Sequence, residues 1–525
     1  MNTETTSATR QIARAAGLVM SAFVLGQAIG LVRQVLVANA FGTSGSIDAF
    51  NAANRVSETL FILIAGGALG SGFIPTFTGL LTNNRRRDAW KLASAIANLV
   101  LIVLIVVSAL AAIFAPQVVR ILAPGFSADP AKESLAVNLI RVMLPSVVLF
   151  GLSGLVMGIL NSHQIFFVPA LAPSMYQLGM IFGVLVLSPS MGIYGLAWGV
   201  VIGSALYLTI QIPLLLRQSG KYSPILGLQL PAVREVARLM GPRLLGAAVV
   251  QLNFMVNIRL ASYTLEGSVT AIVLAFALML MPQAAIAQSI ATAAMPTLSA
   301  QYARGRLDEV RSSLAASLRG VLLLSIPASL GLMLLRAPIV AMLYQRGEFD
   351  SHSTQLVAWA LLWYAAGLVG HSVMEVLARA FYALHDTKTP VIVGVVAMSL
   401  NVVFSFTFSA WFKRLGWMPH GGLALANSLA TALEMTVLLV LMRRRLNGLH
   451  GRRVLQGAGQ AAIAALAMSL ALWAWLHLTS GQSAWIAGGG GIAIGGAVYG
   501  VGVLILGVKE VGQVFRAVKA RVFRS

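Results

Sequence analysis

Charged side chains interrupt only a few of the long apolar stretches in this chain, and they are its strongest candidates for chemistry. A charge at the centre of a bilayer costs about 2.5–3.5 kcal/mol on insertion scales, so such residues face a wet cavity or pair with one another. Arginines outnumber acids among them, and guanidinium groups match phosphate oxygens in bidentate geometry. We therefore predict an anionic cargo. The candidate binding residues are Arg33, Asp48, Arg55, Arg259, Glu375 and Arg379.

These candidates differ in how readily a purely structural role explains them. Arg55 stands near the start of a stretch and could extend its charge to the interface. Glu375 and Arg379 are four residues apart, which also fits an ion pair within one helix. Arg33 and Arg259 lie deep in the first and seventh stretches. We expect these two arginines to line a central cavity, with Asp48 and the Glu375–Arg379 pair tuning or gating it.

Asparagine side chains and glycines form two further patterns within the apolar stretches. Carboxamide oxygens can bind a hard cation such as Na⁺, or hydrogen-bond between helices. Glycines four residues apart, as in Gly195, Gly199 and Gly203, predict close helix packing. The candidate cation ligands are Asn253, Asn257, Asn401 and Asn427.

Enzyme chemistry has little support in this sequence. There is no cysteine, no G-x-x-x-x-G-K-[ST] loop for ATP and no H-E-x-x-H pair. A membrane enzyme acting on polyprenyl phosphates would need clustered acids and a nucleophile. His352 with Glu348 and Asp350 is the nearest such cluster, and it lacks a matched nucleophile. We predict no catalytic residue, no cofactor and no assigned metal site.

The elements that position these residues are fourteen apolar stretches, each long enough for a transmembrane helix. Hydrophobic residues make up 58% of the chain and charged residues 10%, far from the balance of a soluble protein. A bilayer core needs about 20 apolar helical residues, and lipid cannot satisfy free backbone groups. We predict an all-α polytopic membrane protein with 14 transmembrane helices. The expected spans are 12–38, 49–80, 90–115, 134–160, 164–188, 193–217, 239–264, 269–300, 313–336, 354–383, 388–412, 420–442, 456–479 and 484–507.

Basic residues gather in alternate loops, which accounts for much of the net charge of +21. This pattern follows the positive-inside rule and predicts that both termini lie in the cytoplasm. Basic rims also attract anionic membrane lipids, whereas no compact basic domain indicates nucleic-acid binding. The clusters are Arg85, Arg86, Arg87 and Lys91; Arg217, Lys221, Arg234, Arg238 and Arg243; Arg304, Arg306 and Arg311; Arg443, Arg444, Arg445, Arg452 and Arg453; and, in the tail, Lys509, Arg516, Lys519, Arg521 and Arg524.

An internal duplication organises the spans, with an offset of about 221 residues. Pro124-Gly125-Phe126 in the first half corresponds to Arg346-Gly347-Glu348-Phe349 in the second. Each repeat holds six spans, so the halves have parallel topology, as in transporters that move two lobes around a central site. The predicted parts are a lobe at 1–222, a lobe at 223–450, and two further spans with a basic cytoplasmic tail at 451–525. A structural bundle that arose by duplication is the alternative.

Several short motifs resemble the MurJ/MviN family of lipid II flippases. They extend from about Gly26 to the C-terminus and fit a 6+6+2 arrangement of spans. Together they are specific, whereas any one of them is weak. They are Gly30-Leu31-Val32-Arg33, Asp48-Ala49-Phe50, Ala123-Pro124-Gly125-Phe126, Gly158-Ile159-Leu160-Asn161, Pro169-Ala170-Leu171-Ala172-Pro173 and Asp386-Thr387-Lys388-Thr389-Pro390.

The resemblance implies a flippase of the cytoplasmic membrane. It would carry lipid-linked peptidoglycan precursor outward by alternating access, with a diphosphate held among arginines. Na⁺, H⁺ or the membrane potential would supply the energy, and cell-wall synthesis proteins are further expected partners. Arg33 matches a cavity arginine of the family, whereas other family arginines fall on Gln27, Phe61 and Ala277. Export of another polyprenyl-linked saccharide or amphiphile, and a membrane scaffold without transport, are the alternatives.

Overall fold

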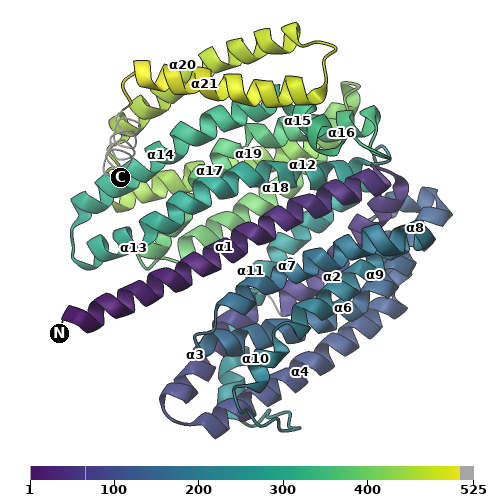
Figure 1. The fold of residues 1–525 in the computed structure, drawn as a ribbon, viewed down its shortest axis with the longest axis vertical. Helices are drawn as coiled ribbons and strands as arrows, with labels where there is room; N and C mark the ends of the chain where they lie inside the picture. Colours follow the sequence, from purple (N-terminus) through teal and green to yellow (C-terminus); the bar gives the residue numbers. More distant parts are fainter. Residues whose placement is uncertain (1, 65–66, 509–525) are drawn as a thin grey trace. The chain divides into compact units, whose positions relative to one another are not determined.

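The computed structural model describes residues 2–64 and 67–508 of the chain, and these residues form helices without any strand (Figure 1). The predicted all-α class is confirmed. The predicted basic tail after residue 508 lies outside the described residues. The helices of the first half are α1(Asn2–Phe41), α2(Gly45–Ile64), α3(Gly67–Thr82), α4(Arg86–Ile113), α5(Ala115–Leu122), η1(Pro124–Ala128), α6(Pro130–Ser162), α7(Phe167–Phe182), η2(Gly183–Leu187), α8(Ser188–Met191), α9(Ile193–Thr209), α10(Ile212–Leu216) and α11(Pro231–Ser262).

The second half continues with helices of similar length. The short segments η2, η3 and η4 are π-helical turns within longer helices. The bounds are α12(Ser268–Gln283), η3(Ala284–Gln288), α13(Ser289–Ala303), α14(Leu307–Leu334), α15(Arg336–Tyr344), α16(Ser351–Ala366), α17(Leu368–Ala383), α18(Lys388–Arg414), α19(His420–Arg445), α20(Gly451–Leu478), η4(Ile486–Gly490) and α21(Gly491–Ile505).

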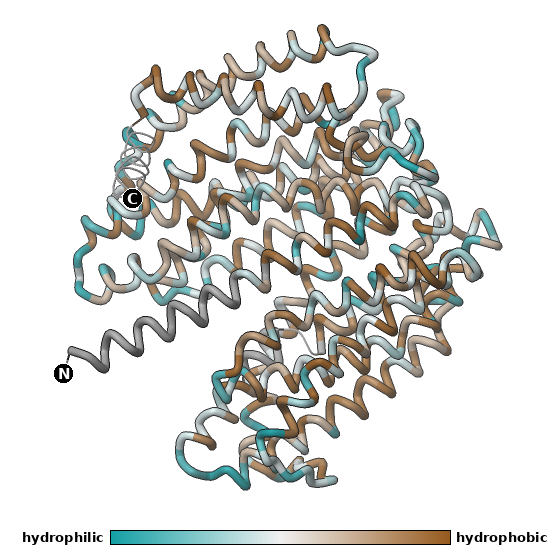
Figure 2. Tube along the Cα trace, in the orientation of Figure 1, coloured by the Kyte–Doolittle hydropathy of each residue, from teal (hydrophilic) through white to brown (hydrophobic). Residues whose placement is uncertain are grey.

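Most of these helices are long and apolar enough to cross a membrane. Eleven pass that test singly, and up to 13 pass if each of two bent helix pairs counts as one span. Figure 2 shows hydrophobic colouring along most helices and hydrophilic colouring at many connecting turns. The remaining predicted span, 49–80, corresponds to α2 and the shorter α3. The count of fourteen therefore stays a prediction, while the multi-span architecture is confirmed.

The described chain forms two compact units. Unit 1 comprises Met1–Glu266 and Arg346–Glu348, and unit 2 comprises Gly267–Gln345 and Phe349–Ser525. The predicted lobes divide at residue 222, where the repeat begins again, whereas the units divide after Glu266. Helix α11 explains the difference, because it packs on α3, α2 and α5 of unit 1.

Unit 1 contains a helix pair in close backbone contact. A Cβ atom on Gly179 of α7 would lie 2.2 Å from the Cα atom of Gly203 of α9, and one on Gly183 would lie 2.7 Å from that of Gly199. The predicted glycine packing is therefore confirmed for this pair. Because backbone cannot yield as a flexible side chain can, these positions accept no side chain without moving a helix.

Two glycine contacts hold distant segments of unit 1 together. Gly125 of η1 donates its N–H to Ser262 Oγ of α11 at 3.1 Å, and a Cβ there would lie 1.9 Å from Ser262 O. Its repeat counterpart, Gly347, has φ +56°, and a Cβ there would lie 2.4 Å from Asn39 O of α1. The neighbouring Glu348 N–H donates to the same oxygen at 3.0 Å. Each repeat thus fastens the end of the first helix of the other repeat.

Unit 2 contains a broken helix. Helices α16 and α17 meet at a 46° bend around Gly367. Two serine hydroxyls donate hydrogen bonds to backbone carbonyl oxygens near the break: Ser428 to Trp363 O and Ser329 to Ala365 O, each at 2.7 Å. Broken helices are tolerated at membrane depth where neighbours re-satisfy the freed backbone groups. Helix α19 packs on α16, α17 and α18. Helix α20 packs on α14 and α21.

Candidate functional site

Arg33 lies on α1 of unit 1 with little to neutralise its charge. Its Nη1 contacts Met180 Sδ at 3.3 Å, and its Nε is buried without a hydrogen-bond partner. Among residues 2–64 and 67–508, no carboxylate lies within ion-pair distance of it. Arg33 and Glu58 both act electrostatically on the Tyr176 hydroxyl, so both charges belong to one polar region around it. An anionic ligand would supply the missing partner.

Arg55 and Glu58 form the next part of this region on α2. Arg55 Nη1 contacts Glu58 Oε2 at 3.0 Å, and its guanidinium lies 4.7 Å from the ring centroid of Phe254 on α11. Asn54 Nδ2 donates to Glu58 Oε1 at 2.9 Å. The Arg55 side chain is 19% exposed and already carries a carboxylate partner. The interaction with Glu58 explains how this charge is tolerated, so substrate binding by Arg55 stays a prediction.

Aromatic side chains occupy the space beside this polar region. The Phe150 ring lies 5.0 Å from Phe61 and 5.0 Å from Tyr176, measured between centroids. Phe61 stands where the resemblance would place an arginine. In this chain the position belongs to an aromatic cluster, which leaves Arg33 with fewer cationic neighbours.

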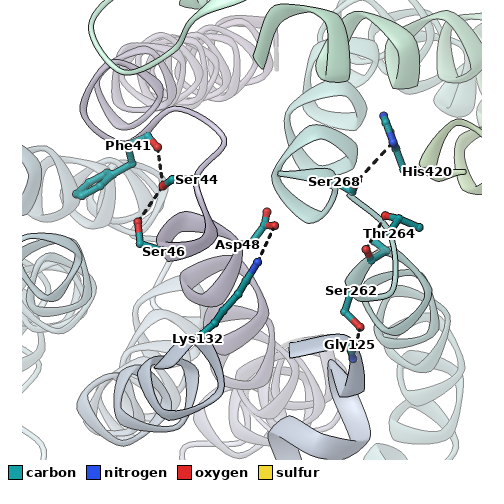
Figure 3. A network of polar contacts seen from close by, with 11 residues as sticks. Phe41, Ser44, Ser46, Asp48, Gly125, Lys132, Ser262, Thr264, Ser268 and His420 are labelled. Carbon is teal, nitrogen blue, oxygen red and sulfur yellow. Dashed lines mark hydrogen bonds and ion pairs between the residues drawn. The ribbon is translucent and has the colours of Figure 1, made fainter. Parts of the chain in front are cut away.

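Asp48 lies at the beginning of α2, in a polar network drawn in Figure 3. Its Oδ2 accepts from Lys132 Nζ at 3.3 Å, and the side chains are 2% and 14% exposed. Lys132 also lies 4.5 Å from the ring centroid of Phe126. The ion pair joins α2 to α6, so Asp48 has a structural role. The predicted span 134–160 begins after Lys132, and a long-range ion pair such as this one has no local sequence signal.

Arg259 lies in the last turn of α11. Its Nη1 donates to Ile121 O near the end of α5, at 2.6 Å. A cation at the C-terminal carbonyls of a helix is favourable, and here it attaches α11 to unit 1. The prediction that Arg259 also binds substrate remains open to experiment.

Unit 2 holds a second polar region on α17 and α19. Arg379 contacts Glu375 at 2.8 Å and donates to Thr292 Oγ1 of α13, also at 2.8 Å. His371 Nε2 lies 3.0 Å from Asn427 Oδ1 and 3.3 Å from Thr431 Oγ1. The expected intrahelical ion pair is therefore present. Sequence reasoning did not anticipate Thr292 or Thr431 as partners.

The four candidate asparagines lie in two places. Asn257 Nδ2 donates to Asn253 Oδ1 at 3.2 Å within α11 of unit 1. Asn401 accepts from Ser405 Oγ at 3.2 Å in α18, and Asn427 contacts His371. All four are at least nine-tenths buried and hydrogen-bonded. No group of three or more His, Asp or Glu in the described residues could hold a metal ion. Cation binding by these asparagines stays a prediction.

Comparisons with known proteins found several matches to one family. The family model "Lipid II flippase MurJ" matches residues 37–488. The chain is 32% identical over 436 residues to the lipid II flippase MurJ of Burkholderia cenocepacia, covering 82% of this chain and 83% of that protein. It is 31% identical over 519 residues to the probable lipid II flippase MurJ of Vibrio cholerae serotype O1, covering 94% and 96%.

Solved structures share the fold. A structure of lipid II flippase MurJ in an inward closed conformation matches with a TM-score of 0.80 at 25% identity, covering 93% of this chain and 98% of that chain. An inward-facing multidrug resistance transporter of the MATE family matches with a TM-score of 0.67 at 16% identity, covering 83% and 99%. The second likeness concerns the fold alone.

Proposed function

This chain belongs to the MurJ family of lipid II flippases, and from that premise we propose that it carries lipid II across the cytoplasmic membrane. The precursor moves from the inner to the outer leaflet by alternating access. The transfer breaks no covalent bond, so the protein needs ordered polar groups for the headgroup and an apolar path for the tail. The chain supplies apolar helices throughout and a small number of charges inside them.

The state of Arg33 is the observation that carries this proposal. It is a cation within a span, its Nη1 donates to the Met180 thioether, and its Nε lacks a hydrogen-bond partner. A diphosphate offers several anionic oxygens to such a group. Arg55 is held by Glu58 and Arg259 by a backbone oxygen, so Arg33 is the arginine most available to a ligand.

The energy source, orientation and partners extend the proposal. Both termini lie in the cytoplasm, in keeping with the basic loops on that side. Na⁺, H⁺ or the membrane potential drives the cycle, and cell-wall synthesis proteins receive the product. Transport of another polyprenyl-linked saccharide would use the same diphosphate chemistry and is the second candidate, although the relatives named above are lipid II flippases.

Complementation tests the proposal in cells depleted of their lipid II flippase. We expect rescue by the unaltered chain and loss of rescue by Arg33→Gln, which keeps a polar side chain but removes the charge. Arg85→Gln is the matched control, because Arg85 is 63% exposed and pairs with Asp88 in the first turn of α4. It should rescue fully.

Three outcomes separate the alternatives. Absence of rescue by the unaltered chain, with normal membrane expression, contradicts lipid II as the cargo. Rescue by Arg33→Gln contradicts the role of Arg33. Flipping by the purified protein in vesicles of another polyprenyl diphosphate saccharide, but not of lipid II, establishes the second candidate.

A further inference from the structure

Glu434 is a solitary carboxyl group in the interior of unit 2. It is 8% exposed and lies in α19, eleven residues before the helix ends at Arg445, or about 16 Å along the axis. Within residues 2–64 and 67–508 it has no hydrogen-bond or ion-pair partner. The other deeply placed acids differ, since Glu58 and Glu375 each contact an arginine.

The surroundings of Glu434 are apolar on the side of α18. A Cβ atom on Gly394 of α18 would lie 3.2 Å from Glu434 Oε1, so the carboxyl lies against bare helix surface. Helices α12, α16, α17 and α18 pack on α19, and none brings a charge within ion-pair distance of this carboxyl. The titratable groups on these helices and on α19 are His352, Tyr364, His371, Glu375, Arg379, Tyr382, Lys388, Lys413, Arg414, His420, Arg443, Arg444 and Arg445.

Most of the nearer groups are occupied elsewhere. His371 contacts Asn427 and Thr431, and Glu375 contacts Arg379. The cations of α18 stand at its two ends, and the arginines of α19 stand in its last turn. An ionised Glu434 would therefore have no counter-charge, which is strongly disfavoured away from water.

A run of polar side chains begins beside Glu434. Asn427, Thr431 and Glu434 are spaced i, i+4, i+7 and so share one face of α19. His371 lies within hydrogen-bond distance of the first two. The contacts Gly394–Glu434 and Gly422–Phe408 set an antiparallel register for α18 and α19, which places Asn401 opposite Asn427. Carboxamide, imidazole and hydroxyl groups thus follow the carboxyl toward the beginning of α19.

We propose that Glu434 is the group that binds a coupling proton, and that the protein exchanges this proton for its lipid cargo. The inference rests on the proposed transport function and names its coupling ion. An O–H bond forms on Glu434 with a proton from the external water, and the neutral carboxyl then occupies its buried position on α19. The same O–H bond breaks when the group meets cytoplasmic water, and the proton leaves there.

Proteoliposomes holding the full-length protein and fluorescently labelled lipid II test the exchange. An imposed pH difference supplies the driving force, while valinomycin and potassium hold the membrane potential at zero. One exchanged proton shifts the distribution of lipid II between leaflets by up to about tenfold per pH unit. We expect this shift with the unaltered chain and its loss in Glu434→Gln, which still equilibrates lipid II without a gradient.

Glu309→Gln is the matched control, since Glu309 is exposed in the first turn of α14 and pairs with Arg306 at 3.2 Å. It should respond to the gradient like the unaltered chain. An equal response in Glu434→Gln, or no response in the unaltered chain that does flip lipid II, overturns the proposal. The proposed function stands in both cases.

Infrared spectroscopy measures the protonation of the Glu434 carboxyl group in the absence of any cargo. The unaltered protein should show the C=O stretch of a protonated, water-shielded carboxylic acid, and Glu434→Gln should lack it. If the spectra of the unaltered protein and of Glu434→Gln do not differ in this band, the proposal is overturned. This measurement tests the proton site on Glu434 even if the unaltered chain flips no lipid II. Absence of flipping would contradict the proposed function alone.

Discussion

The Asp48–Lys132 pair gives a quantitative test of how unit 1 is held together. The ion pair joins α2 to α6 at 3.3 Å, with side chains 2% and 14% exposed. We consider Asp48→Asn, Lys132→Met and the double substitution. Each single change leaves one member of a buried pair without its counter-charge, whereas the double change removes both.

Both single substitutions should destabilise unit 1. Breaking a buried pair typically costs about 3–5 kcal/mol, most of it from the charge left behind. After Asp48→Asn, Lys132 keeps the Phe126 ring at 4.5 Å, an interaction worth about 0.5–2 kcal/mol, so the loss should be near 3 kcal/mol. After Lys132→Met, the carboxylate keeps its other polar contacts but loses the Lys132 ammonium, and about 3–5 kcal/mol is expected.

The double substitution should cost less than the sum of the two. A coupling energy of about 1.5–3 kcal/mol is expected, as for groups in direct contact. Chemical denaturation in detergent, followed by helical circular dichroism, gives the four free energies of unfolding. The cycle also subtracts the other polar contacts that Asp48 makes. Additive effects, with coupling below about 0.5 kcal/mol, would refute the view that this pair stabilises unit 1.

Two further predictions concern a helix contact and acid stability. Gly179→Ala should lower the free energy of unfolding by about 1–3 kcal/mol, because its Cβ would meet the backbone of Gly203. Gly79→Ala is the control: its Cβ would point into open space, so it should raise the free energy of unfolding by about 0.5–1 kcal/mol. Equal melting temperatures of the two variants would contradict this prediction. The Thr389 backbone N–H holds the pKa of Asp386 below its ordinary value, so its stabilisation is complete above about pH 4 and is lost as the pH falls further. Thermal melts of Asp386→Asn should therefore show a shallower acid decline, and a decline as steep as that of the unaltered chain would count against this assignment.

Much of the fold could be predicted from sequence, because apolar length and basic loops are local signals. Thirteen of the fourteen predicted spans have an apolar helix of spanning length if each bent pair counts as one, and the glycines of α9 pack as their spacing indicates. The bend between α16 and α17 was not anticipated, since no proline marks it and its carbonyls are satisfied by Ser329 and Ser428 from other helices.

Contacts of the candidate residues could be predicted only where both partners lie on one helix, and their role in substrate binding stays a prediction. Glu375–Arg379 follows from helical spacing, and the structure contains that pair. Arg259 bonds to Ile121 O across 138 positions of sequence, which no spacing rule could indicate. The internal repeat likewise shows where the second copy of the sequence begins, but it does not predict the helices on which α11 packs.

The two glycine contacts of unit 1 have a consequence for biosynthesis. Chains are made from the N-terminus and generally fold part by part as they emerge. Unit 1 nevertheless needs α11 to meet Gly125, and it needs residues 346–348 to meet Asn39. Its assembly therefore cannot finish when its first six spans have left the ribosome. The N-terminal half can complete these contacts only after the chain has been translated beyond Glu348.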